Sequence, residues 1–192
     1  MLDKNPKQLL NDNLTQIKNE FSETSPNIIL FSKPFLKSEF LIRLINSNNF
    51  PVIFLDFDLL YSGFFNSGMI KKNDNVRIFQ SSKINWEKDL KEIIKKISSE
   101  KVLVILDSLN GVYNMFDELE SARFINAAIM LLSNVSRHTK SMIVVTAIAI
   151  KNDKGEWILS PWGRHLINSK KSGTYYLSMS ETGLILTSID KK

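Results

Sequence analysis

Short, continuous apolar runs constrain the fold of this chain more than any other feature. Four runs of four to seven residues, rich in Val, Ile, Leu and Phe, occupy residues 27–31, 52–55, 101–107 and 142–147. Runs of this length are typical of strands that are buried on both faces of a parallel sheet. Segments long enough for helices separate them, and strands that alternate with helices predict an α/β fold with parallel strand pairing.

The two ends of the chain carry different patterns. Near the start, apolar residues recur every three or four positions and predict one face of an amphipathic helix: Leu10, Leu14, Ile17 and Phe21. Near the end, residues 174–178 and 184–187 flank turn residues and predict an antiparallel hairpin. We therefore expect a single domain over residues 1–192, with an N-terminal helical extension over 1–24 and a core over 27–190.

The connecting segments predict further helices. Apolar residues at helical spacing predict helices from Ser38 onward, after Asn85 as the N-cap, and from near Asp117. Residues 76–79 predict a short strand. Glycines and asparagines are concentrated within 61–75 and predict a loop or an irregular element there.

Composition excludes several classes of site. The chain has 192 residues, no Cys and only 2 His, which excludes disulfides and thiolate catalysis and argues against a zinc or iron–sulfur centre. It has no apolar run of membrane-spanning length, and its first residues are polar, so we expect no membrane contact and a cytoplasmic location. A formal net charge of +5 permits, without requiring, a polyanionic partner.

Residues 31–38 have the spacing of a phosphate-binding loop without its glycines. The pattern G-x-x-x-x-G-K-[ST] keeps its last two members as Lys37 and Ser38, but Phe31 and Leu36 occupy its glycine positions. Glycines let successive N–H groups close around phosphates, whereas Leu36 obstructs that approach and Pro34 removes a donor. We therefore expect ATP hydrolysis to be lost and no cofactor to be bound, with Mg-ATP as the alternative.

Each residue of this candidate site also has an ordinary structural explanation. Lys37 either contacts phosphates or is a solvated lysine in the first turn of a helix, and Ser38 either joins it or caps the helix. Asp107 either reaches magnesium or bonds N–H groups of the following turn. Asp58 is either a general base or a turn or capping carboxylate. We favour the structural explanation for Lys37, Ser38 and Asp58 and favour neither for Asp107.

Four segments in a fixed order resemble one known family. They are the eroded loop at 31–38, the run Phe54-Leu55-Asp56-Phe57-Asp58, the run 102–109 that ends in Asp107-Ser108-Leu109, and Ser160-Pro161-Trp162-Gly163-Arg164-His165-Leu166. Together they resemble the RecA-like ATPases, and specifically the branch of the archaeal recombinase RadA, its paralogues and KaiC-like proteins. Arg164 departs from this pattern, because the family has the second glycine of a Pro-x-Gly-Gly-His segment there.

The resemblance implies a fold and a vestigial site. The implied fold has three layers, with a mainly parallel central sheet flanked by helices and a C-terminal antiparallel hairpin. The implied nucleotide site consists of Lys37, Ser38 and Asp107, with Asp107 as the magnesium carboxylate. Asp58 stands where the family has its catalytic acid, and we expect it to be a vestigial general base.

Residues 151–171 combine basic and aromatic side chains. Five basic residues stand among two acidic residues and two tryptophans. Cations on phosphates and rings under bases form single-stranded nucleic-acid sites, and in the resembling recombinases a mobile loop of this region contacts DNA. The alternative is that the tryptophans pack on the core or a partner and the lysines are solvated. The candidate nucleic-acid or interface residues are Lys151, Lys154, Trp157, Trp162, Arg164, His165, Lys170 and Lys171.

The functional expectation follows from the resemblance and from the altered loop. We expect a non-catalytic or weakly nucleotide-binding accessory subunit that packs against other RecA-like subunits, in DNA recombination or repair, and that contacts single-stranded DNA or RNA. A scaffold subunit that binds tRNA, as in the Elongator complex, is one alternative. An active ATPase with an atypical phosphate loop is the other.

Overall fold

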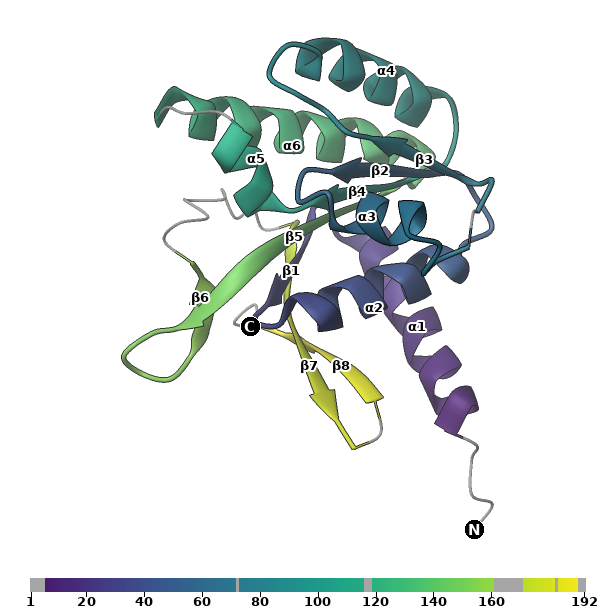
Figure 1. The fold of residues 1–192 in the computed structure, drawn as a ribbon, viewed down its shortest axis with the longest axis vertical. Coiled ribbons are helices and arrows are strands. Elements are labelled where there is room, and N and C mark those ends of the chain that lie inside the picture. The colour runs from purple at the N-terminus through teal and green to yellow at the C-terminus, as the bar shows by residue number, and fades with distance from the viewer. Residues whose placement is uncertain (1–5, 72, 116–118, 161–170, 182, 190–192) are drawn as a thin grey trace.

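A mixed β-sheet forms the centre of the protein (Figure 1). The structure is a computed structural model that describes residues 6–71, 73–115, 119–160, 171–181 and 183–189. In this part of the chain the sheet has 8 strands in the order β3-β2-β4-β5-β1-β7-β8, with β6 paired to β5. The strands are β1 (Asn27–Phe31), β2 (Val52–Asp56), β3 (Val76–Phe79), β4 (Leu103–Asp107), β5 (Met142–Lys151), β6 (Trp157–Leu159), β7 (Gly173–Ser180) and β8 (Gly183–Ser188).

Strand pairing agrees with the expected α/β class. β1 pairs in parallel with β5 and β7, and β2 pairs in parallel with β3 and β4. β4 and β5 are also parallel, whereas β8 is antiparallel to β7 and β6 is antiparallel to β5. The mainly parallel sheet and the closing antiparallel hairpin are therefore confirmed.

Helices cover both faces of the sheet. They are α1 (Pro6–Glu23), α2 (Pro34–Asn46), α3 (Leu60–Asn66), α4 (Trp86–Ser99), α5 (Leu109–Met115) and α6 (Leu119–Thr139). One face packs against α1, α2 and α3, and the opposite face packs against α4, α5 and α6. Among the described residues, no helix combines the length and the apolar character needed to cross a membrane.

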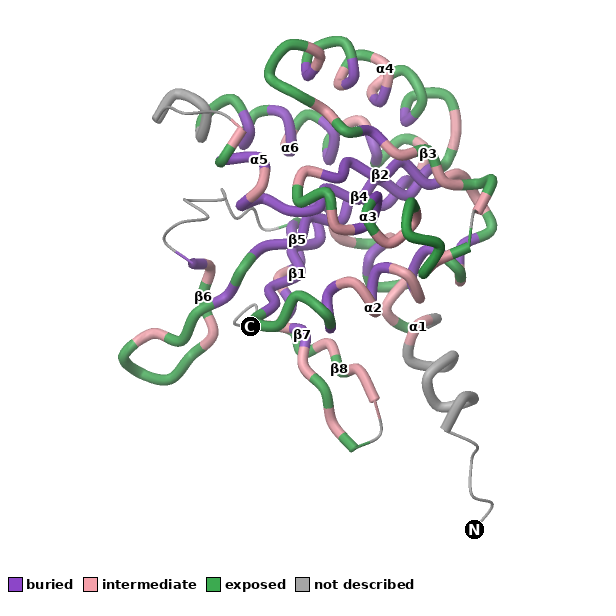
Figure 2. Tube along the Cα trace, viewed as in Figure 1, coloured by how far each residue is buried: buried purple, intermediate pink, exposed green. Residues whose placement is uncertain are grey.

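Alternation along the central strands builds these two cores. All five residues of β4 are buried, which matches a strand covered on both sides (Figure 2). Leu103 and Ile105 enter the core under α2, while Val104 and Leu106 enter the core under α4 and α6. Because successive side chains of a strand point to opposite faces, one apolar run supplies both cores.

The segment between β1 and α2 contradicts the predicted loop. β1 ends at Phe31 and α2 begins at Pro34, so Ser32 and Lys33 alone connect them. The helix therefore begins four residues before the predicted start at Ser38. Proline is well placed at the first helical position, because its ring presets φ and its missing N–H would have no partner there. Leu36 is buried in the core under α2, and this apolar contact favours the helix over an open loop.

Other differences are smaller. The predicted loop at 61–75 contains the short helix α3, and α5 was not predicted. β5 is longer than expected and forms a second hairpin with β6, which projects from the sheet (Figure 1). In α1, Phe21 is buried and Ile17 packs on the same core, while the side chain of Leu10 lies outside the described part.

Candidate functional site

Lys37 lies buried where the parallel strands end. Its side chain leaves α2 near the helix start and is only 1% exposed. Its Nζ lies 2.8 Å from an oxygen of Asp58 and 2.8 Å from an oxygen of Asp107. The predicted solvated lysine is therefore wrong, because two carboxylates compensate the ammonium for the water that it loses on burial. We call Lys37, Asp58 and Asp107 the Lys37 cluster.

Asp107 ends β4 and is held on three sides. It is 2% exposed, and the Thr146 hydroxyl of β5 donates a 2.5 Å hydrogen bond to the carboxylate oxygen that contacts Lys37. Its backbone carbonyl, not its side chain, accepts the N–H groups of Phe57 and Asp58, at 2.7 Å and 3.2 Å. The carboxylate itself bonds Lys37 and Thr146, and in the turn that follows Asp107 the N–H of Gly111 donates to the Ser108 hydroxyl. A cis peptide bond joins Asp107 to Ser108.

Asp58 connects the end of β2 to the start of α5. Its side chain is 27% exposed, and one oxygen contacts Lys37 while the other accepts a 2.9 Å hydrogen bond from the Ser108 hydroxyl. The same hydroxyl accepts the N–H of Gly111, which is the pattern of a helix N-cap. Ser108 is therefore the N-cap of α5. The helix that follows Asp58 is α3, whose N-cap is Leu59 and which has no side-chain cap hydrogen bond, so the predicted capping role of Asp58 is wrong and its carboxylate pairs with Lys37.

Ser38 takes no part in this cluster. It lies within α2, and its hydroxyl donates to the carbonyl of Pro34 at 3.2 Å, one helical turn earlier. Such back-bonding is common for serine inside a helix. The helix is capped by Lys33 without a side-chain hydrogen bond, so the predicted capping role of Ser38 is wrong.

Asp56 is a buried carboxylate that the sequence reasoning missed. It is 1% exposed and lies directly beside Asp107 in the register of β2 and β4. One oxygen accepts both the N–H and the hydroxyl of Ser62 at 2.6 Å, and the other has no hydrogen-bond partner among the described residues. The available signal was its position at the end of the apolar run, two residues before Asp58.

Burial opposes the charges of both Lys37 and Asp107, and their ion pair offsets part of that cost. Burial lowers the pKa of Lys37, but the negative charges of Asp107 and Asp58 outweigh it and hold the pKa above the usual 10.5. Burial raises the pKa of Asp107 by more than Lys37 and the Thr146 hydrogen bond lower it. The lysine therefore remains an ammonium at neutral pH and attracts both carboxylates.

The residues present do not fit Mg-ATP. A phosphate cradle needs free N–H groups after the first strand, but the N–H groups of Leu36 and Lys37 both donate to the Lys33 carbonyl and Pro34 has none. The ammonium that would contact phosphates holds two carboxylates instead. Among the described residues, no group of three or more acidic, His or Cys side chains is arranged to hold a metal ion.

Part of the predicted nucleic-acid segment, residues 151–160 and 171, lies within the described residues. Trp157 stacks on Tyr176, with ring centroids 4.2 Å apart, and the Lys151 ammonium lies 5.2 Å from the Trp157 ring. Lys154 lies in the exposed turn between β5 and β6, and Lys171 is exposed just before β7. The remaining candidates lie outside the described residues: Trp162, Arg164, His165 and Lys170. The nucleic-acid hypothesis for this segment stays a prediction.

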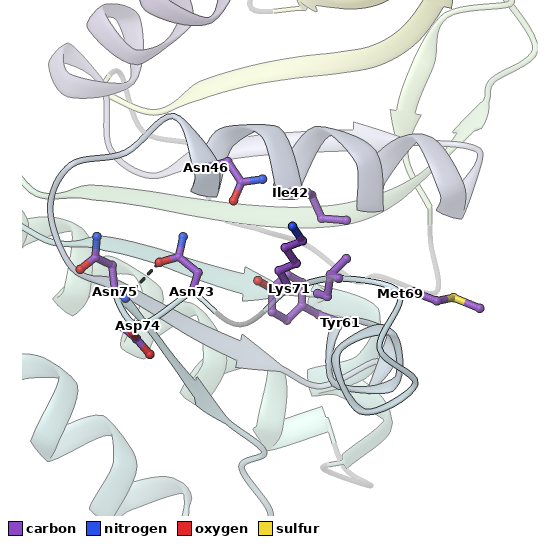
Figure 3. A pocket seen from close by; sticks show the side chains of 9 residues that line it. Ile42, Asn46, Tyr61, Met69, Lys71, Asn73, Asp74 and Asn75 are labelled. Carbon is purple, nitrogen blue, oxygen red and sulfur yellow. Dashed lines mark hydrogen bonds between the residues drawn. The ribbon is translucent and has the colours of Figure 1, made fainter.

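A polar pocket of about 640 Å³ lies apart from these candidates, between α2 and the chain that leads into β3 (Figure 3). Ile42 and Asn46 approach it from α2, and Tyr61, which stacks on Phe54, approaches it from α3. Burial and the charge of Asp56 raise the pKa of Tyr61. None of the residues predicted for a site lines this pocket.

Comparison with known proteins adds no family. No protein-family model matches the chain, and no curated protein matches it.

Proposed function

We propose that this protein is a RecA-like accessory subunit that does not hydrolyse ATP. One observation carries the proposal: α2 begins at Pro34, inside the frame of the phosphate loop, and the lysine of that frame is bound by Asp58 and Asp107. A lysine held in this way stabilises the strand ends and leaves no cation for a phosphate. We therefore propose that the protein acts by packing against other RecA-like subunits.

Three features support the RecA-like part of the proposal. The sheet is mainly parallel and closes with an antiparallel hairpin. Lys37, Asp58 and Asp107, which resemble the lysine, catalytic acid and magnesium carboxylate of that family, meet at the carboxyl ends of the strands. Open parallel sheets place their ligands at that edge, so the cluster occupies the position of a ligand site and fills it with its own side chains.

The accessory role is the proposal's second part. RecA-like cores pack side by side, and a member without a nucleotide site can keep its packing surfaces while a partner hydrolyses ATP. The resemblance to recombinase paralogues favours DNA recombination or repair as the setting. This assignment rests on the resemblance and on the altered loop.

The nucleotide part is tested by equilibrium binding of a fluorescent ATP analogue, with and without magnesium. We expect no saturable binding in the micromolar range and no ATP turnover. Micromolar binding that weakens in Ser38→Ala would contradict the proposal, and this variant should fold because Ser38 bonds only its own helix. An active ATPase with an atypical loop would then be the better explanation.

The assembly part needs a separate measurement. Light scattering of the protein alone and mixed with a purified recombinase of the same organism reports whether the two form a complex, which we expect. In parallel, single-stranded DNA, duplex DNA and tRNA are compared at low and high salt, since phosphate contacts weaken as salt rises. A complex with tRNA and none with the recombinase would favour the Elongator-like scaffold instead.

A further inference from the structure

A groove with a basic rim runs between β3 and α4. Figure 1 shows α4 at the top of the molecule. Its volume is about 840 Å³, and it lies on the face of the sheet opposite to α2. Its charged lining consists of five basic and three acidic residues: Arg77, Lys88, Lys91, Lys95, Lys96, Asp74, Glu92 and Glu100. We call it the α4 groove. None of the three residues of the Lys37 cluster lines it.

Charge pairing leaves a row of lysines open along the α4 groove. Arg77 pairs with Glu92, and Lys96 pairs with Glu100, so these four charges offset one another. The other lysines have no hydrogen-bond or ion-pair partner within the described chain and are exposed: Lys88, Lys91 and Lys95. Their spacing of three and four residues places them on one side of α4.

The floor and the edge of the α4 groove suit an extended chain. Closely packed apolar side chains lie beneath the groove, among them Ile53, Phe79 and Ile93, which are 4%, 8% and 0% exposed, so the charged rim and the strand edge offer the contacts. In the described sheet β3 pairs only with β2, so its outer edge carries main-chain groups without a neighbouring strand. Such an edge is the usual place for a peptide to add as a further strand.

We propose that the α4 groove binds an extended, acidic segment of a partner protein. The segment adds to the edge of β3, and its carboxylates pair with Lys88, Lys91 and Lys95. Because successive side chains of a strand point in opposite directions, these carboxylates face α4 and the intervening side chains of the segment face the other side of the sheet.

The same features argue against single-stranded nucleic acid here. Binding of that kind combines cations with rings on which bases stack. The one aromatic ring in the lining is Phe79, which is only 8% exposed and lies 4.7 Å below the Arg77 guanidinium. A peptide uses the strand edge and the lysines together, whereas a nucleic acid finds no stacking platform.

The test measures binding of a fluorescein-labelled peptide of alternating Glu and Val residues to the full chain by anisotropy. We expect saturable binding that weakens more than about tenfold in the triple variant Lys88→Glu, Lys91→Glu, Lys95→Glu. A matched triple variant, Lys33→Glu, Arg137→Glu, Lys140→Glu, makes the same change of net charge at exposed basic residues outside the α4 groove. We expect it to bind within about twofold of the wild type.

Two further probes complete the test. N-methyl groups on alternate residues of the same peptide block the main-chain hydrogen bonds along one of its two edges. We expect the methylated peptide to bind more weakly when that edge faces β3. Equal loss in both triple variants, no binding of the peptide, or groove-dependent binding of oligothymidylate in its place would each overturn the proposal. Because every substituted residue is exposed, circular dichroism should show an unchanged fold in both variants.

Discussion

Gly111 lies so close to Asp58 that a Cβ added to the glycine would come within 2.5 Å of the carboxylate oxygen that Ser108 contacts. The same Cβ would lie 2.9 Å from the Cβ of Phe57 and 3.0 Å from its carbonyl carbon. The start of α5 and the turn after β2 are therefore in direct contact at Gly111, where a side chain would not fit. This contact holds Asp58 within reach of Lys37.

Replacement of this glycine tests the contact. We expect Gly111→Ala to lower the free energy of unfolding by about 1–3 kcal/mol, because the backbone of Phe57 has to move. Gly63→Ala is the matched control, since Gly63 also lies in a seven-residue helix but has no atom within 4 Å of an added Cβ. There we expect no loss, and a gain of up to about 1 kcal/mol from helix propensity. Urea unfolding measures both, and equal effects would contradict the close approach.

Removal of the buried ammonium should be costly. We expect Lys37→Met to lower the free energy of unfolding by about 3–5 kcal/mol, because it leaves a buried carboxylate without its partner. Lys33→Met removes the same charge from an exposed position four residues earlier and should change stability by less than about 0.5 kcal/mol. Adding Asp107→Asn to Lys37→Met should recover part of the loss, since the uncompensated charge is then gone. A Lys37→Met variant as stable as Lys33→Met would contradict the buried ion pairs of Lys37 with Asp58 and Asp107.

Alkaline pH should weaken the Lys37 cluster. Burial lowers the pKa of Lys37, but Asp107 and Asp58 raise it further, to above the 10.5 of an unfolded lysine. The folded state therefore holds this proton more tightly, so the stabilisation is complete below about pH 10.5 and is lost as the pH rises through the folded-state pKa. Unfolding free energies measured up to strongly alkaline pH should fall more steeply for the wild type than for Lys37→Met, in which the other titrating groups remain. Parallel curves would contradict this sign.

The hydroxyl of Thr146 should stabilise the fold through its hydrogen bond to Asp107. We expect Thr146→Val to cost about 1.5–3 kcal/mol, which is typical for loss of a hydrogen bond to a charged group. Thr146→Ser keeps the donor and should lose less. The pKa of Asp107 should rise further in Thr146→Val, because the hydrogen bond lowers it in the wild type. An NMR titration of the Asp107 carboxyl carbon measures this shift. An unchanged pKa would mean that the Thr146 hydrogen bond does not stabilise the charged form of Asp107.

Much of the fold was predictable because its strands are continuous apolar runs. The four runs became β1, β2, β4 and β5, and the closing hairpin formed where alternating residues flank Gly183. The helices α3 and α5 were missed because seven residues make only about two turns, too few for a clear period. β6 was missed because it has only three residues.

The candidate site was predictable in membership but not in its contacts. Lys37 was identified from the phosphate-loop spacing and Asp58 and Asp107 from runs that end in Asp, and the structure brings these three together but leaves Ser38 apart. Their ion pairs depend on where α2 begins. Pro34 was weighed as a missing donor in a loop, although it is equally a signal for the first residue of a helix. Ser108 and Thr146 belong to residue types too common to attract attention without coordinates.

The short connection between β1 and α2 also has a consequence for redesign. Phe31 and Leu36 occupy the two glycine positions of the phosphate-loop pattern, and both side chains are packed in the interior, only 3% and 4% exposed. Glycine at either position would cost about 2–5 kcal/mol of a stability that is commonly only about 5–15 kcal/mol. An engineer who wished to build a phosphate loop here would have to rebuild the core first.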